Sequence, residues 1–231
     1  GLIEYGISVI DLGQIATPVM YYATHAHEPD CGFIVTGSHN PSEYNGLKMV
    51  LLRKTLVHED INELYTLLDH QKPTINKGSY LKHDIHPQYI AAIISRIKLK
   101  RPLKVVVDCG NGISGPIVLE VLTLLGCEVI ALYCDIDGRF PNHHPDPSIE
   151  ENLLDLKNAV LAHQADIGLG FDGDGDRLGV VTETGNIIWP DRLLMYYAKN
   201  ILESNPGSTI VFDVKCSSHL PKLIENQGGL G

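Results

Sequence analysis

The chain contains 231 residues, of which 44% are hydrophobic and 20% are charged, and its formal net charge is −10 at pH 7. This length and apolar content exclude a disordered chain and favour one large domain or two of ordinary size. The acidic balance argues against a nucleic-acid binder, and the apolar runs are far shorter than the roughly 20 residues that cross a bilayer. We therefore expect neither nucleic acid nor a membrane as a partner.

The first segment predicts two strands joined by a structured loop. Residues 32–36 and 47–51 are short apolar runs, and the loop between them carries Asn-Pro and Asn-Gly turn formers. Residues 1–11 fit the end of a helix followed by a strand. Apolar spacing predicts a helix over residues 61–68, and the polar residues 71–87 are expected to form a linker.

The second segment alternates predicted strands with predicted helices. The strands are residues 105–107, 127–133, 166–171 and 178–181, and the helices are residues 114–125 and 149–162. Such alternation is typical of a mostly parallel sheet that helices cover on both faces. The third segment adds helices over residues 190–202 and 220–225 and a strand over residues 209–214.

We therefore expect consecutive α/β domains with mixed, mostly parallel sheets. The expected domains are residues 1–84, 85–187 and 188–231, with the first truncated at its N-terminal side and the last incomplete. The chain has no initiator Met and both ends look cut, so we expect a fragment. The five cysteines form no CxxC pair, which favours free thiols in a reducing cytoplasm.

The strongest chemical signal is the sequence DGDGDR at residues 172–177, directly after a predicted strand. Glycine permits tight turns, so Asp172, Asp174 and Asp176 can point at one centre. Three carboxylates this close repel one another unless a cation neutralises them. Hard oxygen ligands at this density suit Mg²⁺ or Ca²⁺, and we predict a metal site here.

Two rival interpretations use the same loop. An EF-hand would also begin D-x-D-x-D, and Glu183 stands at its twelfth position. Its sixth position requires glycine, however, and Arg177 stands there. An aspartyl-nucleophile phosphatase using Asp172 would also place D-x-D after a strand, and this alternative stays open.

A second candidate is the loop TGSHNP at residues 36–41. Ser38 beside His39 could be a nucleophile with a nearby base. Lys48, on the next predicted strand, could neutralise an anion near Ser38. Taken alone, this loop could equally be a turn, and Lys48 a surface lysine.

Two further motifs carry weaker signals. Residues 110–115 fit G-x-G-x-x-G between a strand and a helix, which would suit a non-enzymatic dinucleotide-binding module. Asp108 beside the phosphate position and Pro116 at the helix start argue against that function. We therefore expect Asp108 and the turn at residues 110–115 to serve packing only. The adjacent histidines His143 and His144 lie between prolines, where they do not converge easily on zinc, and we expect a rigid loop.

Taken together, these motifs resemble the α-D-phosphohexomutase family. Residues 36–41 are similar to its phosphoserine loop, residues 172–177 to its metal loop, and residues 44–48 (YNGLK) to the segment behind the phosphoserine. Residues 140–145 (FPNHHP) and 212–216 (FDVKC) resemble the bacterial phosphomannomutase/phosphoglucomutase branch most closely. The resemblance covers essentially the whole chain.

The resemblance implies an isomerase, a four-domain hexose phosphate mutase that moves a phosphoryl group between the 1- and 6-positions of a hexose through a bisphosphate. It implies that Ser38 carries the phosphoryl group and is a further ligand to Mg²⁺, which three aspartates hold (Asp172, Asp174 and Asp176). His39 and Lys48 would assist proton transfer and charge balance, and Arg177 would hold the phosphoryl group.

The resemblance also implies partners and limits. The substrates would be mannose or glucose 1- and 6-phosphates and hexose 1,6-bisphosphate, bound by a cytoplasmic monomer. Lys48 and Arg177 are too few cations to hold a second phosphate as well, so we expect this chain alone to lack full activity. Phosphoglucosamine mutase and the aspartyl-nucleophile phosphatase remain as alternatives.

Overall fold

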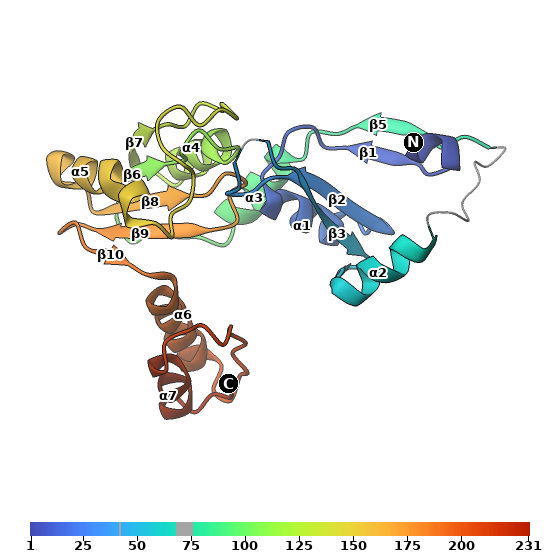
Figure 1. Ribbon diagram of the computed structural model, residues 1–231. Coiled ribbons are helices and arrows are strands. Elements are labelled where there is room, and N and C mark those ends of the chain that lie inside the picture. The colour runs from blue at the N-terminus through green and yellow to red at the C-terminus, as the bar shows by residue number, and fades with distance from the viewer. Residues whose placement is uncertain (42, 68–75) are drawn as a thin grey trace.

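The computed structural model describes residues 1–41, 43–67 and 76–231. Figure 1 shows two α/β units side by side, with the helices α6 and α7 below them. The described residues form a two-stranded sheet, a three-stranded sheet and a five-stranded sheet. No described helix is both long and apolar enough to cross a bilayer. The expected α/β class with mixed sheets is confirmed.

The first unit contains two small sheets and the helix α1. Its elements are η1 (Leu2–Tyr5), β1 (Val9–Asp11), α1 (Thr17–Ala26), β2 (Cys31–Thr36), β3 (Gly46–Leu51), β4 (Lys54–Thr55), α2 (His58–Leu67) and β5 (Tyr80–Lys82). Strands β1 and β5 pair in parallel, whereas β2, β3 and β4 pair antiparallel. Val19 and Met20 of α1 pack with Val50 and Ile85 in a buried core, which fixes α1 beside β2.

The second unit is built around a five-stranded sheet. Its elements are α3 (His86–Ile94), β6 (Lys104–Asp108), α4 (Gly115–Leu124), β7 (Glu128–Leu132), η3 (Glu150–Leu153), α5 (Leu154–His163), β8 (Ile167–Phe171), β9 (Leu178–Thr182) and β10 (Ile187–Ile188). The strand order is β10-β9-β8-β6-β7. Strand β6 is an interior strand that pairs in parallel with β7 and β8, while β9 pairs antiparallel with both β8 and β10. The sheet is therefore more mixed than the strand–helix alternation indicates.

The sequence of β6 explains its place in the interior of this sheet. Val105 and Val107 pack on one face against apolar residues of α4, whereas Val106 packs on the other against Leu156 and Val160 of α5. Because side chains alternate across a strand, three consecutive valines bury both faces. Because β6 and β8 are parallel neighbours, the loops after their carboxyl ends meet at one edge of the sheet.

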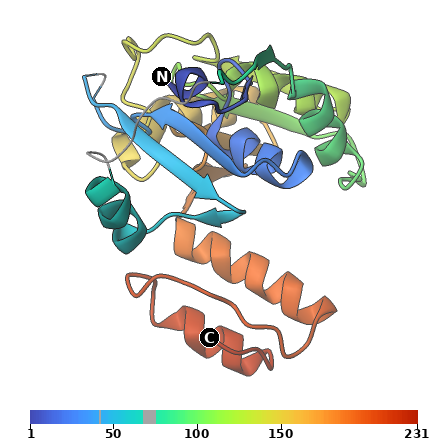
Figure 2. The ribbon, with the colours of Figure 1, turned by 90° about the vertical axis from the view of Figure 1, so that its right-hand side faces the viewer.

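The C-terminal residues form a helical pair set apart from the three sheets (Figure 2). The helices α6 (Pro190–Ser204) and α7 (His219–Asn226) bury Ala198 and Leu202 against Leu220 and Ile224. The strand predicted over residues 209–214 is wrong, since only one isolated bridge, between Thr209 and Leu230, forms there. In the described residues no neighbouring strand pairs with this segment, and Val211 and Val214 are 87% and 96% exposed.

The linker expected over residues 71–87 is also corrected. Residues 71–75 lie outside the described residues, as does residue 68 of the predicted helix 61–68. Tyr80–Lys82 form β5, and α3 begins at His86. Backbone pairing with β1 outweighs the polar composition that indicated a linker.

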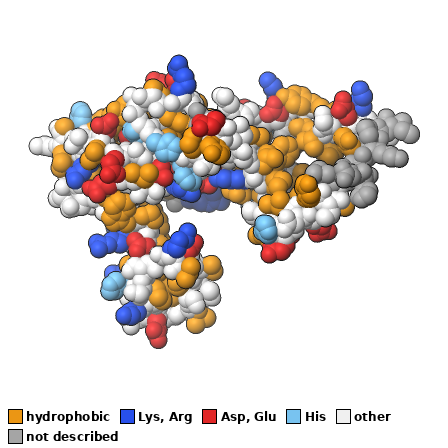
Figure 3. Space-filling model, in the orientation of Figure 1, with side chains coloured by type: hydrophobic (Ala, Val, Ile, Leu, Met, Phe, Trp, Pro, Cys, Tyr) orange, Lys and Arg blue, Asp and Glu red, His pale blue; other side chains and the backbone are white. Residues whose placement is uncertain are grey.

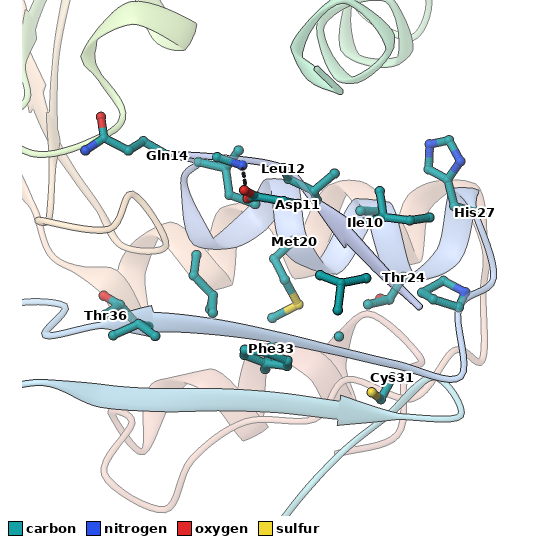
Figure 4. Close-up of a pocket in the computed structure, with 18 of the residues that line it drawn as sticks. Ile10, Asp11, Leu12, Gln14, Met20, Thr24, His27, Cys31, Phe33 and Thr36 are labelled. Carbon is teal, nitrogen blue, oxygen red and sulfur yellow. Dashed lines mark hydrogen bonds between the residues drawn. The ribbon is translucent and has the colours of Figure 1, made fainter. Parts of the chain in front are cut away.

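An apolar cavity of about 650 Å³ lies between β1 and β2, with α1 as its wall (Figure 4). Ile10 and Leu12 approach it from β1 and the turn after it, Phe33 from β2 and Met20 from α1. No lysine or arginine is among the described residues that line it. Neighbouring side chains of β1 and β5 are exposed and contribute to a hydrophobic surface on this unit (Figure 3). The described lining therefore offers a phosphate no lysine or arginine and only the imidazole of His27.

Candidate phosphoryl-transfer and metal site

The aspartate loop lies between β8 and β9, where the antiparallel pair turns. One carboxylate oxygen from each of Asp172, Asp174 and Asp176 lies within 4.8 Å of the others. Gly175 has φ +73°, a conformation that glycine adopts without strain. Asp172 and Asp174 are 0% and 4% exposed. The predicted convergence of the three carboxylates is therefore present in the fold.

Ser38 lies in the loop after β2 and faces this cluster from the other unit. Its Oγ lies 3.1 Å from Oδ2 of Asp172 and 3.2 Å from Nδ1 of His39. The backbone N–H of Ser38 donates to Oγ1 of Thr36 at 2.8 Å, which holds the loop at the strand end. Ser38 has φ +50°, an uncommon conformation outside glycine that presents its side chain to Asp172.

A glycine allows the two loops to approach this closely. A Cβ atom on Gly173 would lie 2.3 Å from the carbonyl oxygen of Ser38. Any side chain at position 173 would therefore push the serine loop away from the carboxylates.

Lys48 reaches the same cluster from β3. Its Nζ donates to Oδ2 of Asp174 at 2.7 Å and to Oδ2 of Asp176 at 2.6 Å. The same Asp174 oxygen accepts hydrogen bonds from Oγ1 of Thr17 at 2.7 Å and of Thr36 at 3.0 Å. The lysine therefore balances charge between two of the three carboxylates, and the threonines orient one of them.

The other oxygen of Asp174 provides a test of whether a metal ion fits. Oδ1 of Asp174 is buried and accepts no hydrogen bond from any described residue. An unpaired buried carboxylate oxygen is costly unless a cation or donor completes it. The donor set is oxygen-only, the kind that Mg²⁺, Ca²⁺ and Mn²⁺ prefer. The residues present therefore fit a hard divalent cation.

Burial and charge shift the pKa values of this cluster in different directions. Burial, with the neighbouring carboxylates, raises the pKa of Asp172 to about 6. Burial would also raise the pKa of Asp174, but hydrogen bonds from Lys48 and Thr17 outweigh it and hold this pKa below its ordinary value. For Lys48, burial acts to lower the pKa, and its bonds to the two carboxylates raise it. Lys48 thus favours the charged form of Asp174, whereas burial disfavours the charged form of Asp172.

Arg177 lies at the edge of the site. Its Nε is 4.0 Å from Oδ2 of Asp172, and its side chain is 46% exposed. Its backbone N–H, together with that of Asp176, donates to Oδ1 of Asp172 at 3.0 and 2.9 Å. The guanidinium can therefore move toward a group on Ser38 while its backbone fixes Asp172.

The glycine-rich turn at residues 110–115 packs against the aspartate loop. The N–H of Ile113 donates to the carbonyl oxygen of Gly173 at 3.0 Å. A Cβ on Gly112 would lie 2.7 Å from that same oxygen. The close approach that this glycine permits is to protein backbone, which supports the packing role over a dinucleotide site.

Sequence reasoning missed several residues of the site. Thr17 precedes the aspartate loop by more than 150 residues and lies at the start of α1, a helix that the sequence analysis did not predict. His144, which the sequence analysis assigned only to a rigid loop, donates from Nε2 to the backbone carbonyl oxygen of His39. No local motif signals either contact, because both depend on how the two units dock.

The fold and the two facing loops define a member of the α-D-phosphohexomutase family. Residues 1–74 match the family model for phosphoglucomutase/phosphomannomutase alpha/beta/alpha domain I, and residues 87–185 match that for domain II. The chain belongs to the phosphoglucomutase/phosphomannomutase family.

Named relatives agree with the family models. The chain is 51% identical over 229 residues to a phosphomannomutase/phosphoglucomutase of Pseudomonas aeruginosa, covering 99% of this chain and 50% of that protein. It is 46% identical over 231 residues to a phosphoglucomutase of Neisseria gonorrhoeae, with coverage of 99% and 50%.

A crystal structure of a phosphoglucomutase/phosphomannomutase family protein from Burkholderia thailandensis shares the fold. It superposes with a TM-score of 0.92 at 46% identity, covering 100% of this chain and 52% of that one. The chain therefore spans about half the length of the relatives it matches.

Proposed function

We propose that this chain carries the phosphoryl-transfer half of a phosphomannomutase/phosphoglucomutase. The reaction is the reversible movement of a phosphoryl group between the 1- and 6-positions of a hexose through a bisphosphorylated sugar. The relatives at 46–51% identity carry these activities in their names. The observation that carries the proposal is the 3.1 Å approach of the Ser38 hydroxyl to the buried Asp172 carboxylate.

In this proposal Ser38 holds the phosphoryl group in the resting protein. The Oγ–P bond breaks as a sugar hydroxyl oxygen forms its bond to phosphorus; the sugar hydroxyl loses its proton, and Oγ gains one to become the serine hydroxyl again. His39, whose Nδ1 is 3.2 Å from Oγ, is placed to hold a proton at that oxygen. In the return step Oγ takes the other phosphoryl group of the bisphosphate.

The three aspartates would hold Mg²⁺, with an oxygen on Ser38 as a further ligand. Bound there, the ion would stabilise negative charge on the transferring group. Lys48 and Arg177 supply the remaining positive charge near Ser38, because a phosphoserine adds about −1.5 to −2 to a cluster of three carboxylates.

Substrates, state and location follow from the same proposal. We propose glucose or mannose 1- and 6-phosphates and hexose 1,6-bisphosphate as substrates. We also propose that the protein is a monomer and lies in the cytoplasm. The free thiols of all described cysteines are compatible with that compartment. Residues 1–84, 85–187 and 188–231 are the proposed domains, and the two family models, over residues 1–74 and 87–185, support the first two.

The test is covalent labelling by hexose 1,6-bisphosphate in the presence of Mg²⁺. We expect one phosphate, stable to hydroxylamine, on the peptide that contains Ser38, and none in Ser38→Ala. Asp174→Asn should slow labelling because the metal loses a ligand. A hydroxylamine-labile phosphate on Asp172 would contradict the mutase proposal and support the aspartyl-nucleophile phosphatase.

A further inference from the structure

The proline-rich loop at residues 141–147 touches the serine loop from the second unit. The imidazole Nε2 of His144 donates to the backbone carbonyl oxygen of His39, which follows Ser38 directly. A carbonyl oxygen can only accept, so the proton of His144 is on Nε2. This contact joins a loop that the proposed chemistry does not use to the segment that carries the nucleophile.

The backbone of His144 is itself fixed by two donors. Its carbonyl oxygen accepts from the N–H of Asp146 at 2.8 Å and from Nδ1 of His143 at 3.0 Å. Pro145 is buried beside it and closes the loop against Gly110 and Gly173, where added Cβ atoms would lie 2.9 and 3.4 Å from its ring. The ring of His144 therefore projects from a backbone with little freedom.

His143 anchors this loop to the end of β6 by an ion pair. Its Nε2 lies 3.0 Å from both carboxylate oxygens of Asp108, which is 2% exposed. Oδ1 of Asp108 also accepts from the N–H of Gly110 at 2.9 Å. Both ring nitrogens of His143 thus face groups that accept, an arrangement that suits the two N–H donors of an imidazolium.

We propose that His144 is a positioning residue for Ser38, acting through the carbonyl of His39, and that the Asp108–His143 pair fixes it in place. The inference rests on the proposed function, since it assigns how the nucleophile loop is held. On one side of His39 its carbonyl oxygen accepts from His144, and on the other its Nδ1 meets the Ser38 hydroxyl. Loss of the His144 donor would let the His39–Asn40 peptide rotate, which would shift His39 and move the neighbouring Ser38 Oγ away from Asp172.

The test compares three substitutions in the full chain. His144→Gln can place an amide donor near the Nε2 position, His144→Asn cannot reach that far, and His144→Leu has no donor. His163→Leu, at an exposed position of α5, is the matched control. We expect His144→Leu and His144→Asn to slow phosphorylation of Ser38 by hexose 1,6-bisphosphate by about tenfold or more, since small misplacements of reacting groups are costly. His144→Gln should retain most of the parent's phosphorylation rate, and His163→Leu should match the parent.

A second readout does not depend on activity. The N–H of Asn40 donates to the carbonyl oxygen of Gly37 at 2.9 Å within the serine loop. Deuterium exchange of the peptide over residues 36–41 should accelerate in His144→Leu and His144→Asn and return toward the parent rate in His144→Gln. Unchanged exchange and labelling in all three would overturn the inference. Absence of labelling in the parent, with the expected exchange pattern, would instead overturn the proposed function alone.

Discussion

The Oγ of Ser38 lies 3.1 Å from Oδ2 of Asp172, although 134 residues separate them in the chain. Strand β2 of the first unit ends just before the serine, and strand β8 of the second ends just before the aspartate. Each loop alone is a polar turn. Because two strand ends converge, a nucleophilic hydroxyl comes to lie at the edge of a carboxylate cluster that fits a divalent cation.

Gly173→Ala should weaken this convergence. The new methyl group would lie 2.3 Å from the carbonyl oxygen of Ser38, so one of the two loops must move. We expect slower labelling of Ser38 and a destabilisation of about 1–3 kcal/mol from the overpacked contact. The matched control is Gly138→Ala, because position 138 has no atom within 4 Å of an added Cβ. Equal labelling rates in the two variants would show that the close approach is not required.

Lys48→Met should separate charge balance from metal binding. Removing Nζ leaves Asp174 and Asp176 without their shared cation. In EDTA we expect a loss of about 1–3 kcal/mol in the free energy of unfolding, typical of lost charged hydrogen bonds. Added Mg²⁺ should then raise the melting temperature more in the variant than in the parent, because the ion neutralises carboxylates that Lys48 no longer balances. A smaller Mg²⁺ effect in the variant would contradict this assignment.

The pKa of Asp172 gives a pH prediction for the metal-free protein. The folded pKa is about 6, whereas the ordinary value is 3.8. Between these values the folded protein binds more protons than the unfolded chain, so this group makes stability fall as pH rises. The resulting decrease in the free energy of unfolding is at most about 3 kcal/mol. Asp172→Asn should be more stable than the parent in EDTA above pH 6. Thermal melts of both proteins from pH 4 to 8 would measure this difference. A variant that is less stable than the parent at every pH would refute the burial argument.

The pKa of His143 predicts a change of the same sign in a higher pH window. Burial acts to lower this pKa, but the bond to Asp108, with the charge of Asp155 nearby, raises it above the ordinary 6.5. The stabilisation is therefore complete below pH 6.5 and is lost as pH rises through the folded pKa. His143→Gln should cost most at pH 6, and its deficit relative to the parent should shrink at higher pH. A deficit that grows with pH would argue against an imidazolium at this position.

The local parts of the site were predictable from the sequence. The aspartates alternate with glycines over five residues, so their repulsion and convergence could be inferred from spacing alone. Ser38 and His39 stood out less by themselves, and the family resemblance gave them their roles. Lys48 was ambiguous because a strand lysine faces solvent as readily as a site, and docking against the second unit decides between them.

What the sequence could not supply depends on pairing between distant segments. The valine-rich run at residues 105–107 predicted β6 because burial of both faces leaves a continuous apolar signal. Residues 209–214 carry a similar signal, yet in the described residues only Thr209 finds a bridge partner, in Leu230. Likewise β5 has exposed side chains and forms because β1 lies beside it. His144 reaches His39 across 105 positions, which no local pattern encodes.

The central claim is that a phosphate on Ser38 and the three aspartates bind one metal ion. Mn²⁺ accepts the same carboxylate ligands as Mg²⁺ and is paramagnetic. After labelling with hexose 1,6-bisphosphate, electron–nuclear double resonance of the Mn²⁺-loaded chain should show strong coupling to one ³¹P nucleus. Ser38→Ala should still bind Mn²⁺ and show no such coupling. Mn²⁺ held by the aspartates without ³¹P coupling in the labelled parent would contradict the account.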